Sequence, residues 1–292
     1  MESYCRPVLQ TFLEEASTLE ESRYAIIGVP FDLTSSHRRG SRFGPDAIRQ
    51  ASQYMETYSS RTGLDLDDIF FSDFGNTFDT ASVEKTLRKV EGAVGIASSV
   101  NNVPVLLGGE HTVTLGALRA LKPGVVVDFD AHLDLRDRLL GLNLSHGTFM
   151  RRALEELEFR VALVGVRALS KEELAYAGEN EDRVMLLSTK DIRKLGVEGA
   201  SQSLNDWMGA SSVYVSVDMD VIEPGLAPAV GNPSPEGISV TTLLDIMQSI
   251  ASPEIVGFDL TEVTPHYDSG TTAAQAAHIV LETMYLLESA RK

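Results

Sequence analysis

The chain has very little cysteine and no long hydrophobic run, and both absences narrow its class. Its 292 residues include one cysteine, Cys5, which excludes an internal disulfide framework and fits a reducing cytoplasm. No apolar stretch approaches the roughly 20 residues that span a bilayer. The first residues lack the basic start and apolar block of a signal peptide. The sequence therefore predicts a cytoplasmic globular protein with no membrane partner.

Positive charge is also scarce. The 25 Lys and Arg residues are outnumbered by 42 Asp and Glu residues, and the formal net charge is −17. Nucleic acid is an unsuitable partner for such a chain, because its phosphates would be repelled. A cationic substrate or bound metal ions are compatible with the excess of carboxylates. The sequence has no low-complexity linker, and at this length one large domain or two smaller ones are both normal.

Eight short apolar segments alternate with helical segments along the chain. The apolar segments are residues 24–29, 69–74, 104–107, 125–129, 161–166, 184–187, 213–217 and 255–260. Helices are predicted at 45–58, 80–100 (capped by Asp79), around Leu115 and Leu118, and at 171–177, 190–207, 241–250 and 271–288. This alternation is typical of a parallel sheet covered on both faces, either doubly wound or closed as a barrel. In both cases the site lies beyond the carboxyl ends of the strands.

One predicted strand ends in potential metal ligands. Residues 125–134 read V-V-V-D-F-D-A-H-L-D, and the β-branched start is typical of a strand buried on both faces. Asp130, His132 and Asp134 follow at every second position, so their side chains project to one side of an extended backbone. Burying neighbouring carboxylates is costly, and a divalent cation is the simplest compensation. On this stretch alone, a solvated acidic turn is the alternative.

Similar residues follow other predicted strands. His111 comes after the third strand, Asp218 and Asp220 end the seventh, and Glu262 ends the eighth. Taken alone, His111 is better explained as a structural histidine and Glu262 as a solvated residue. Together, oxygen and imidazole ligands at several strand ends favour a metal centre.

The motifs around these residues resemble those of the ureohydrolases, the arginase and agmatinase family. They are G-G-E-H at 108–111, F-D-A-H-L-D at 129–134, S-H-G-T at 145–148, S-V-D-M-D at 216–220 and E-V-T-P at 262–265. Residues 40–49 also look like an agmatinase segment. The resemblance covers about residues 24–288. It implies a three-layer α/β/α arginase-like fold with a mostly parallel eight-stranded sheet, open rather than barrel-shaped, in a single domain of residues 1–292.

The resemblance also implies a pair of Mn²⁺ ions and a set of site residues. One ion would be held by His111, Asp130, Asp134 and Asp218. The other would be held by His132, Asp130, Asp218 and Asp220, so that Asp130 and Asp218 bridge the two. His146 matches the family's proton-transfer histidine, and Glu262 matches its guanidinium-binding carboxylate. The family further implies a homo-oligomer, either a trimer or a hexamer.

These residue types suit the hydrolysis of a guanidino compound to urea and an amine. A guanidinium carbon is a poor electrophile, and two metal ions roughly 3.5–4 Å apart can lower the pKa of water toward about 7. A carboxylate such as Glu262 can accept the planar fork of N–H donors. A histidine such as His146 titrates in the range needed to protonate a leaving amine.

The tail of the substrate is less well defined. S-H-G-T at 145–148 favours agmatine, which would be converted to putrescine and urea. Arg136 and Arg138 would favour a carboxylate tail such as guanidinobutyrate if they point inward, but not if they are exposed or paired with Asp137. Arginine as substrate and an inactive metal-binding relative are further alternatives. The sequence differs from the family's pattern at two positions to which we assign no role. Glu223 stands where the family usually has aspartate, and Asp128 adds a carboxylate to the ligand-bearing strand.

Overall fold

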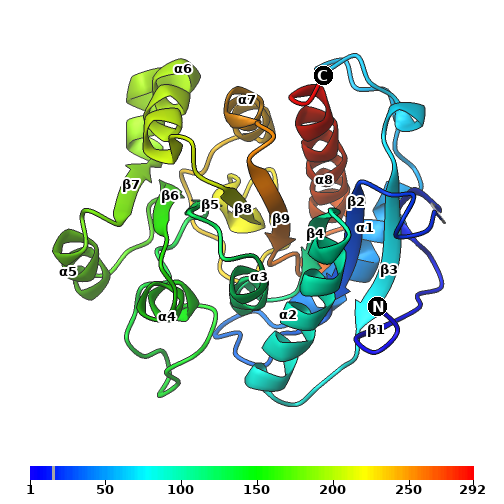
Figure 1. Ribbon diagram of the computed structural model, residues 1–292. Coiled ribbons are helices and arrows are strands. Elements are labelled where there is room, and N and C mark those ends of the chain that lie inside the picture. The colour runs from blue at the N-terminus through cyan, green and yellow to red at the C-terminus, as the bar shows by residue number, and fades with distance from the viewer. Residues whose placement is uncertain (15–16) are drawn as a thin grey trace.

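The computed structural model describes residues 1–14 and 17–292, and the strands in these ranges form one nine-stranded sheet. The strands are β1 (Cys5–Arg6), β2 (Tyr24–Val29), β3 (Phe71–Thr77), β4 (Val103–Gly108), β5 (Val125–Phe129), β6 (Arg160–Val166), β7 (Val184–Ser188), β8 (Val213–Asp218) and β9 (Ile255–Thr261). Their order across the sheet is β1-β3-β2-β4-β9-β8-β5-β6-β7. β2 to β9 are parallel, and β1 is antiparallel to β3. The sheet is open, with β1 and β7 at its edges, so the closed barrel is excluded (Figure 1).

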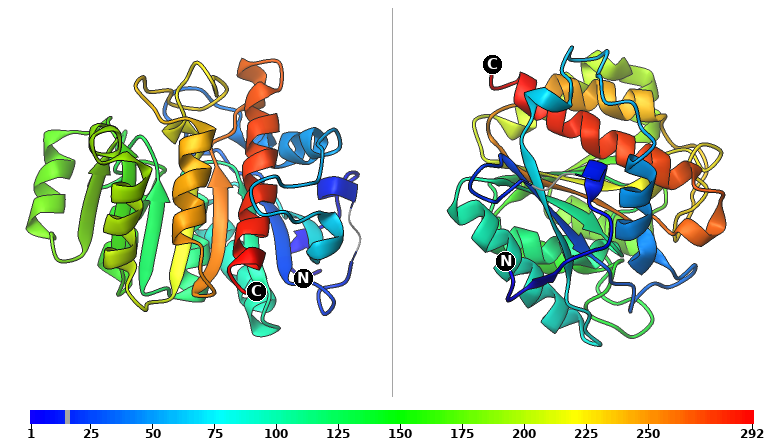
Figure 2. Two further views of the ribbon diagram at one scale, coloured as in Figure 1. Left: turned by 90° about the horizontal axis from the view of Figure 1, so that it is seen from above. Right: turned by 90° about the vertical axis from the view of Figure 1, so that its right-hand side faces the viewer.

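Helices cover both faces of the sheet, as expected for parallel strands joined by crossovers. They are α1 (Gly44–Ser52), α2 (Val83–Ser99), α3 (Thr114–Leu121), α4 (Phe149–Glu156), α5 (Lys171–Glu179), α6 (Thr189–Met208), α7 (Val240–Ile250) and α8 (Thr271–Ser289). α1, α8, α7 and α6 form one layer, and α2, α3 and α4 form the other (Figure 2). α5 packs beside the edge strand β7. None of the described helices is long and apolar enough to cross a membrane.

The hydrophobic core lies on both faces of the sheet, and β5 shows how the sequence divides between them. Val125, Val127 and Phe129 face the layer that contains α8. Val126 faces the α2–α4 layer, and both sets are fully buried. This two-sided burial explains why the strand reads as an unbroken apolar run. Asp128 shares the parity of Val126, so a carboxylate occupies an interior position.

The expected eight strands are present within a residue or two, with a shift at the second segment, where β3 runs to Thr77. The count of eight was wrong, because β1 adds a ninth strand. β1 has two residues, Cys5 and Arg6, which pair with Thr77 and Asn76. A segment this short carries no periodicity, so only its pairing with β3 defines it as a strand.

Two helix boundaries differ from the prediction. α1 ends at Ser52 rather than residue 58, where the Ser52 hydroxyl donates to the Arg49 carbonyl and accepts from the Leu13 amide, an alternative to continuing the helix. α2 is capped by Ser82 rather than Asp79. Asp79 instead forms an ion pair with Arg6 at 3.0 Å.

One helix, α4, follows the loop after β5 and was missed. Residues 190–207 lie in α6, which Gly196 divides into two helical parts, in agreement with the prediction of more than one helix in this segment. Gly196 has a φ of 71°, a conformation that glycine adopts without steric cost.

Candidate active site

The potential ligands come from four strands that are neighbours in the middle of the sheet. The order β4-β9-β8-β5 places their carboxyl ends side by side. His111 lies in a short 3₁₀ turn after β4, Glu262 follows β9, Asp218 ends β8, and Asp130 follows β5. Residues that are up to 151 positions apart in the sequence therefore meet, and His111 N donates to Glu262 Oε1 at 3.0 Å.

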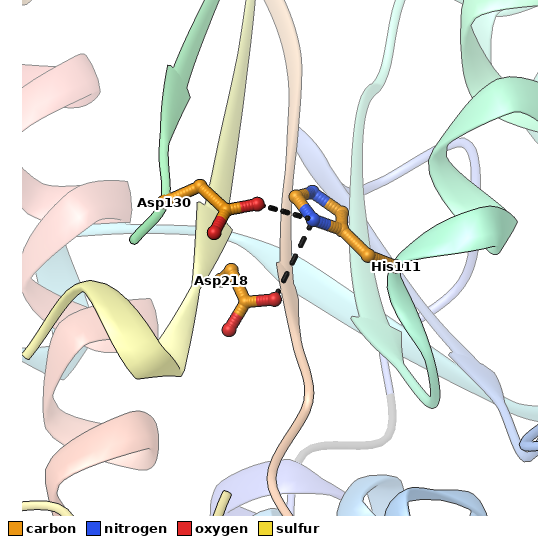
Figure 3. Close-up of side chains that lie close together, drawn as sticks. All are labelled: His111, Asp130 and Asp218. Atoms are coloured by element: carbon orange, nitrogen blue, oxygen red, sulfur yellow. Dashed lines mark hydrogen bonds and ion pairs between the residues drawn. The ribbon is translucent and has the colours of Figure 1, made fainter. Parts of the chain in front are cut away.

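His111 points its Nδ1 at carboxylates from two strands (Figure 3). Nδ1 lies 3.1 Å from Asp130 Oδ2 and 3.5 Å from Asp218 Oδ2. Asp134 Oδ2 is also 3.5 Å from Nδ1. Because ligand atoms of His111, Asp130 and Asp218 all lie within 4.8 Å of one another, this group can hold a metal ion.

A buried hydrogen-bond chain behind His111 sets its tautomer. Ser216 Oγ donates to Asp259 Oδ1 at 2.6 Å, so the same hydroxyl accepts from His111 Nε2 at 2.8 Å. Tyr214 and Thr114 donate to the other oxygen of Asp259. With Nε2 engaged as a donor, Nδ1 is the nitrogen that a cation would bind in place of a proton, which is the usual arrangement of a metal-binding histidine.

A second group adjoins the first. His132 Nδ1 lies 3.0 Å from Asp220 Oδ2 and 3.4 Å from Asp130 Oδ1. Asp130 therefore belongs to both groups. Asp218 belongs to the first group only, and its Oδ1 accepts from the Asp220 amide at 2.7 Å.

The pKa values of these carboxyls show an excess of buried negative charge. Burial, reinforced by Asp220, raises the pKa of Asp218 well above its ordinary value. Burial and the charge of Asp130 raise the pKa of Asp134 to about 7. Burial opposes ionisation of Asp130 as well, but hydrogen bonds from His111 and His132 outweigh it and lower that pKa. Divalent cations would relieve this crowding, so the donor set fits a metal centre.

Glu262 stands beside the first group in an unusual backbone conformation. Its φ is +65°, in the left-handed region, and Asp134 is at +51°. Such conformations cost free energy in a residue with a side chain, and they concentrate at functional sites. Glu262 is 5% exposed. Its Oε2 lies close to Gly231, where an added Cβ would be only 2.9 Å from this oxygen. Burial and the nearby Glu110 raise the pKa of Glu262 well above its ordinary value.

His146 lies on the same cavity and is held from the loop that follows β2. Its Nε2 is 3.0 Å from Ser36 Oγ, and its backbone amide donates to Thr34 Oγ1. Thr34 is in turn fixed by Glu110, which accepts from the Thr34 amide at 2.7 Å. Burial and the neighbouring His132 lower the pKa of His146 to about 4.

A cavity of about 310 Å³ opens onto residues of both metal-binding groups, Glu262 and His146. Its lining includes His111, His132, Asp134, His146, Asp218, Asp220, Glu262, Ser36, Asn232, Arg136 and Glu173. Arg138 does not line it and is exposed. Asp137 pairs with Arg152 and Arg151 rather than with its neighbours. Of the two arginines considered as contacts for the substrate tail, Arg136 therefore faces the cavity and Arg138 does not.

The structure shows the surroundings of Glu223 and Asp128, the two residues that differ from the family's pattern. Glu223 accepts from the Gly237 amide at 2.7 Å, so the longer side chain ties together the loop after β8. Asp128 is fully buried, and neither carboxylate oxygen has a hydrogen-bond partner among the described residues. Its Oδ1 lies 3.5 Å from His111 Nε2.

Comparisons with known proteins agree with this fold and identify the family. The sequence model of the arginase family matches residues 22–286. An agmatinase from Pyrococcus horikoshii is 31% identical over 90% of this chain and 91% of its own length. A guanidinobutyrase from Pseudomonas aeruginosa is also 31% identical, over 94% and 89%. The crystal structure of agmatine ureohydrolase from Thermoplasma volcanium is 35% identical with a TM-score of 0.89, over 97% of this chain and 96% of the other.

The fold and the cavity define an open α/β/α protein with a polar site at the carboxyl ends of its central strands. The chain belongs to the arginase family and is an agmatinase-like ureohydrolase.

The residues that support the site were not predicted from the sequence. Ser216 carried a usable signal, because it precedes Asp218 by two positions and so faces the same side of the strand. Asp259, three residues before Glu262, was a carboxylate inside an apolar strand. Ser36 and Glu173 carried no local signal, since they reach the cavity only through the packing of separate loops.

Proposed function

We propose that the protein is a binuclear manganese hydrolase that cleaves a guanidino compound to urea and an amine, acting as a single domain over residues 1–292. The observation that supports this most directly is the convergence of two His/Asp groups that share Asp130 on one cavity. Glu262 and His146 line the same cavity. We further propose that the chain assembles as a homo-oligomer in the cytoplasm.

Six residues would hold the two ions. His111, Asp130, Asp134 and Asp218 would bind one ion, and His132, Asp130, Asp218 and Asp220 the other. Imidazole and carboxylate donors suit Mn²⁺, and the four carboxylates balance two divalent charges. When bound, the ions supply a water of lowered pKa as a nucleophile at neutral pH.

Glu262 would orient the substrate. Its Oε1 is engaged by the His111 amide, and its carboxylate lines the cavity beside the metal groups. A carboxylate accepts two N–H donors of a planar guanidinium in bidentate geometry, which fixes the plane and position of the central carbon. Burial and Glu110 raise the pKa of Glu262, and a cationic substrate beside it would favour its ionised form.

His146 would handle the proton of the leaving amine. Its lowered pKa keeps the ring neutral at pH 7. Ser36 Oγ can accept a proton from Nε2 or donate one to it, so the hydroxyl holds the ring in place for either protonation state. Once protonated, an imidazole of low pKa is a strong donor to the departing nitrogen.

The three candidate substrates, agmatine, guanidinobutyrate and arginine, share the guanidinium group and differ in their tails. Agmatine is the substrate that the motifs favour, and the relatives include both an agmatinase and a guanidinobutyrase. All three contain the guanidinium group that the proposed chemistry needs.

Urea release from agmatine, arginine and 4-guanidinobutyrate, with manganese present, tests the proposal. Elemental analysis after manganese loading should find two ions per chain. Urea release that depends on manganese and is lost in Asp130→Asn would support the proposed function. Two bound ions without urea from any guanidino compound would instead identify an inactive metal-binding relative.

A further inference from the structure

The cavity has two ends, and the sheet order shows which residues lie at each. Glu262 follows β9, whereas Ala168 follows β6 and Glu173 lies in the first turn of α5. β9 and β6 are separated by β8 and β5, so their ends are roughly 14 Å apart at about 4.8 Å per strand. A guanidinium held at Glu262 therefore directs its tail toward the β6–α5 side of the cavity.

Arg136 and Glu173 form a pair on that side. Arg136 Nη2 lies 3.5 Å from Glu173 Oε2, and both residues line the cavity. Among the lining residues in the described part of the chain, Arg136 is the only Lys or Arg. Its side chain is 39% exposed, which places the guanidinium toward the open side of the cavity, while Glu173 is 3% exposed.

Glu173 is fixed by the start of α5. Its Oε2 accepts from Ser170 N at 2.9 Å and from Ser170 Oγ at 2.7 Å, and Ser170 Oγ accepts from the Glu173 amide. This reciprocal capping box holds the carboxylate in place, and Arg136 occupies the same oxygen from the cavity side. A substrate ammonium would have to displace Arg136 to reach it.

Arg136 can bind a carboxylate, whereas Glu173 could bind only a cation. A guanidinium carries five N–H donors, and contact with Glu173 at one nitrogen leaves the others for a ligand. Their planar arrangement matches a carboxylate in bidentate geometry. A carboxylate tail would meet a cation with free donors, whereas an ammonium tail would meet a like charge.

We propose that Arg136 is a specificity-determining residue that recognises the carboxylate of an ω-guanidino acid, so that such acids are preferred over agmatine. The inference rests on the proposed ureohydrolase function and names its substrate class. Glu173 is the positioning residue that holds Arg136 at the tail end of the cavity.

The test compares 4-guanidinobutyrate with agmatine, which have tails of similar length and opposite charge. We expect kcat/KM of the manganese-loaded protein, measured by urea release, to be at least about tenfold higher for 4-guanidinobutyrate. Arg136→Met should abolish this preference, mainly by raising KM for the acid. Arg136→Lys, which keeps the charge but loses the fork, should keep part of it. Arg138→Met is the matched control, because Arg138 is exposed two residues away and does not line the cavity.

A second measurement does not depend on turnover. In thermal melts of the manganese-loaded protein, 4-guanidinobutyrate should raise Tm of the wild type and of Arg138→Met more than agmatine does. This difference should vanish in Arg136→Met. Melting without ligand checks that each variant is folded, and Arg136→Lys serves if Arg136→Met does not fold.

The outcomes separate this inference from the proposed function. Urea from agmatine at a rate equal to or above that from the acid, with Arg136→Met unchanged in preference, would overturn the inference and leave the ureohydrolase function standing. A tenfold preference for arginine over 4-guanidinobutyrate that persists in Arg136→Met would also overturn it, because the α-ammonium of arginine, and not its carboxylate, would then be the group recognised. No urea from any of these compounds would count against the proposed function itself.

Discussion

At the residue scale, the site depends on the unequal roles of carboxylates that look alike in the sequence. Asp130 Oδ2 faces His111 and its Oδ1 faces His132, so this single side chain joins the two metal-binding groups. The Asp220 carboxylate belongs only to the His132 group. Two aspartates with the same side chain are therefore expected to differ in their importance for the proposed metal centre.

We expect Asp130→Asn and Asp218→Asn to reduce urea release more than Asp220→Asn. Even residues that only support metal ligands contribute about 10–100-fold, so loss of a shared ligand should cost about 100-fold or more. Steady-state kinetics at saturating manganese provide the measurement. Near-normal turnover of Asp130→Asn under these conditions would contradict the assignment of a bridging carboxylate.

Asp128 leads to a prediction about stability. Burial raises its pKa well above the ordinary value, more than the nearby His111 lowers it. A carboxyl with a raised folded-state pKa destabilises the fold above the unfolded pKa of about 3.9, and the penalty disappears as pH falls below that value. Asp128→Asn should therefore increase the free energy of unfolding at pH 7 by about 1–3 kcal/mol, with little change near pH 4.

Denaturant unfolding of the wild type and Asp128→Asn, both with chelator, at the two pH values checks this expectation. Asp128→Leu would not be a suitable comparison, because it also changes the shape of the side chain next to His111. A loss of stability at pH 7 in Asp128→Asn would mean that the ionised carboxylate stabilises His111 more than its burial costs.

At the scale of elements, the helix termini hold the cavity in shape. The capping box at the start of α5 fixes Glu173, and the loop after β2 fixes His146 through Thr34 and Ser36. The strands supply the ligands from a rigid sheet, while these loop and helix-start contacts position the residues that would face the substrate. If Arg136 recognises the substrate tail as proposed, stability and substrate recognition should be coupled at α5.

Ser170→Ala removes this N-cap. The expected cost is about 1 kcal/mol, or a fall in Tm of roughly 2 °C for a chain of this size. Because Glu173 loses the Ser170 hydroxyl as a donor and keeps only the backbone amide of residue 170, the variant should also show a weaker preference between substrate tails. Ser98→Ala is the control, since Ser98 lies exposed within α2 and alanine is a better helix former. An equal effect in both variants would rule out a specific role of the cap.

At the scale of the whole molecule, metal binding and folding should be linked. With a net charge of −17 and several carboxylates crowded at the strand ends, the metal-free chain carries an electrostatic penalty at neutral pH. Ions that bind only the folded state stabilise it by mass action. The gain is about 2.7 kcal/mol at a hundredfold excess over the dissociation constant.

We expect manganese to raise Tm by roughly 4 °C at pH 7.5 and much less near pH 5. Asp134 has a pKa of about 7 in the metal-free fold, above its unfolded value, so the metal-free protein takes up a proton and gains stability as pH falls below 7. Manganese must displace that proton, and its net effect shrinks accordingly.

Thermal melts with chelator or manganese at both pH values, on the wild type and on Asp130→Asn/Asp218→Asn, make this measurement. The double variant should lose most of the manganese effect. A shift of equal size at the two pH values, or one that persists in the double variant, would place the ions elsewhere on the acidic surface.

Local sequence patterns determined the strands and the main ligand motif. A buried parallel strand reads as an apolar run, and alternate residues of an extended chain share a side, so residues 125–134 identify both the strand and its ligands. The same logic located the motifs after the other central strands. The expectation of an open α/β/α fold of the arginase family, drawn from those motifs, is confirmed.

Only the tertiary structure decided how these pieces meet. The order β4-β9-β8-β5 brings His111, Asp130 and Asp218 together, and no local pattern encodes which strands are neighbours. β1 is a strand only because β3 pairs with it. Arg136 faces the cavity while Arg138 does not, because contact with Glu173 on α5 selects one of two chemically identical side chains in the same loop. Contacts between segments distant in the sequence depend on packing, and packing is a property of the whole chain.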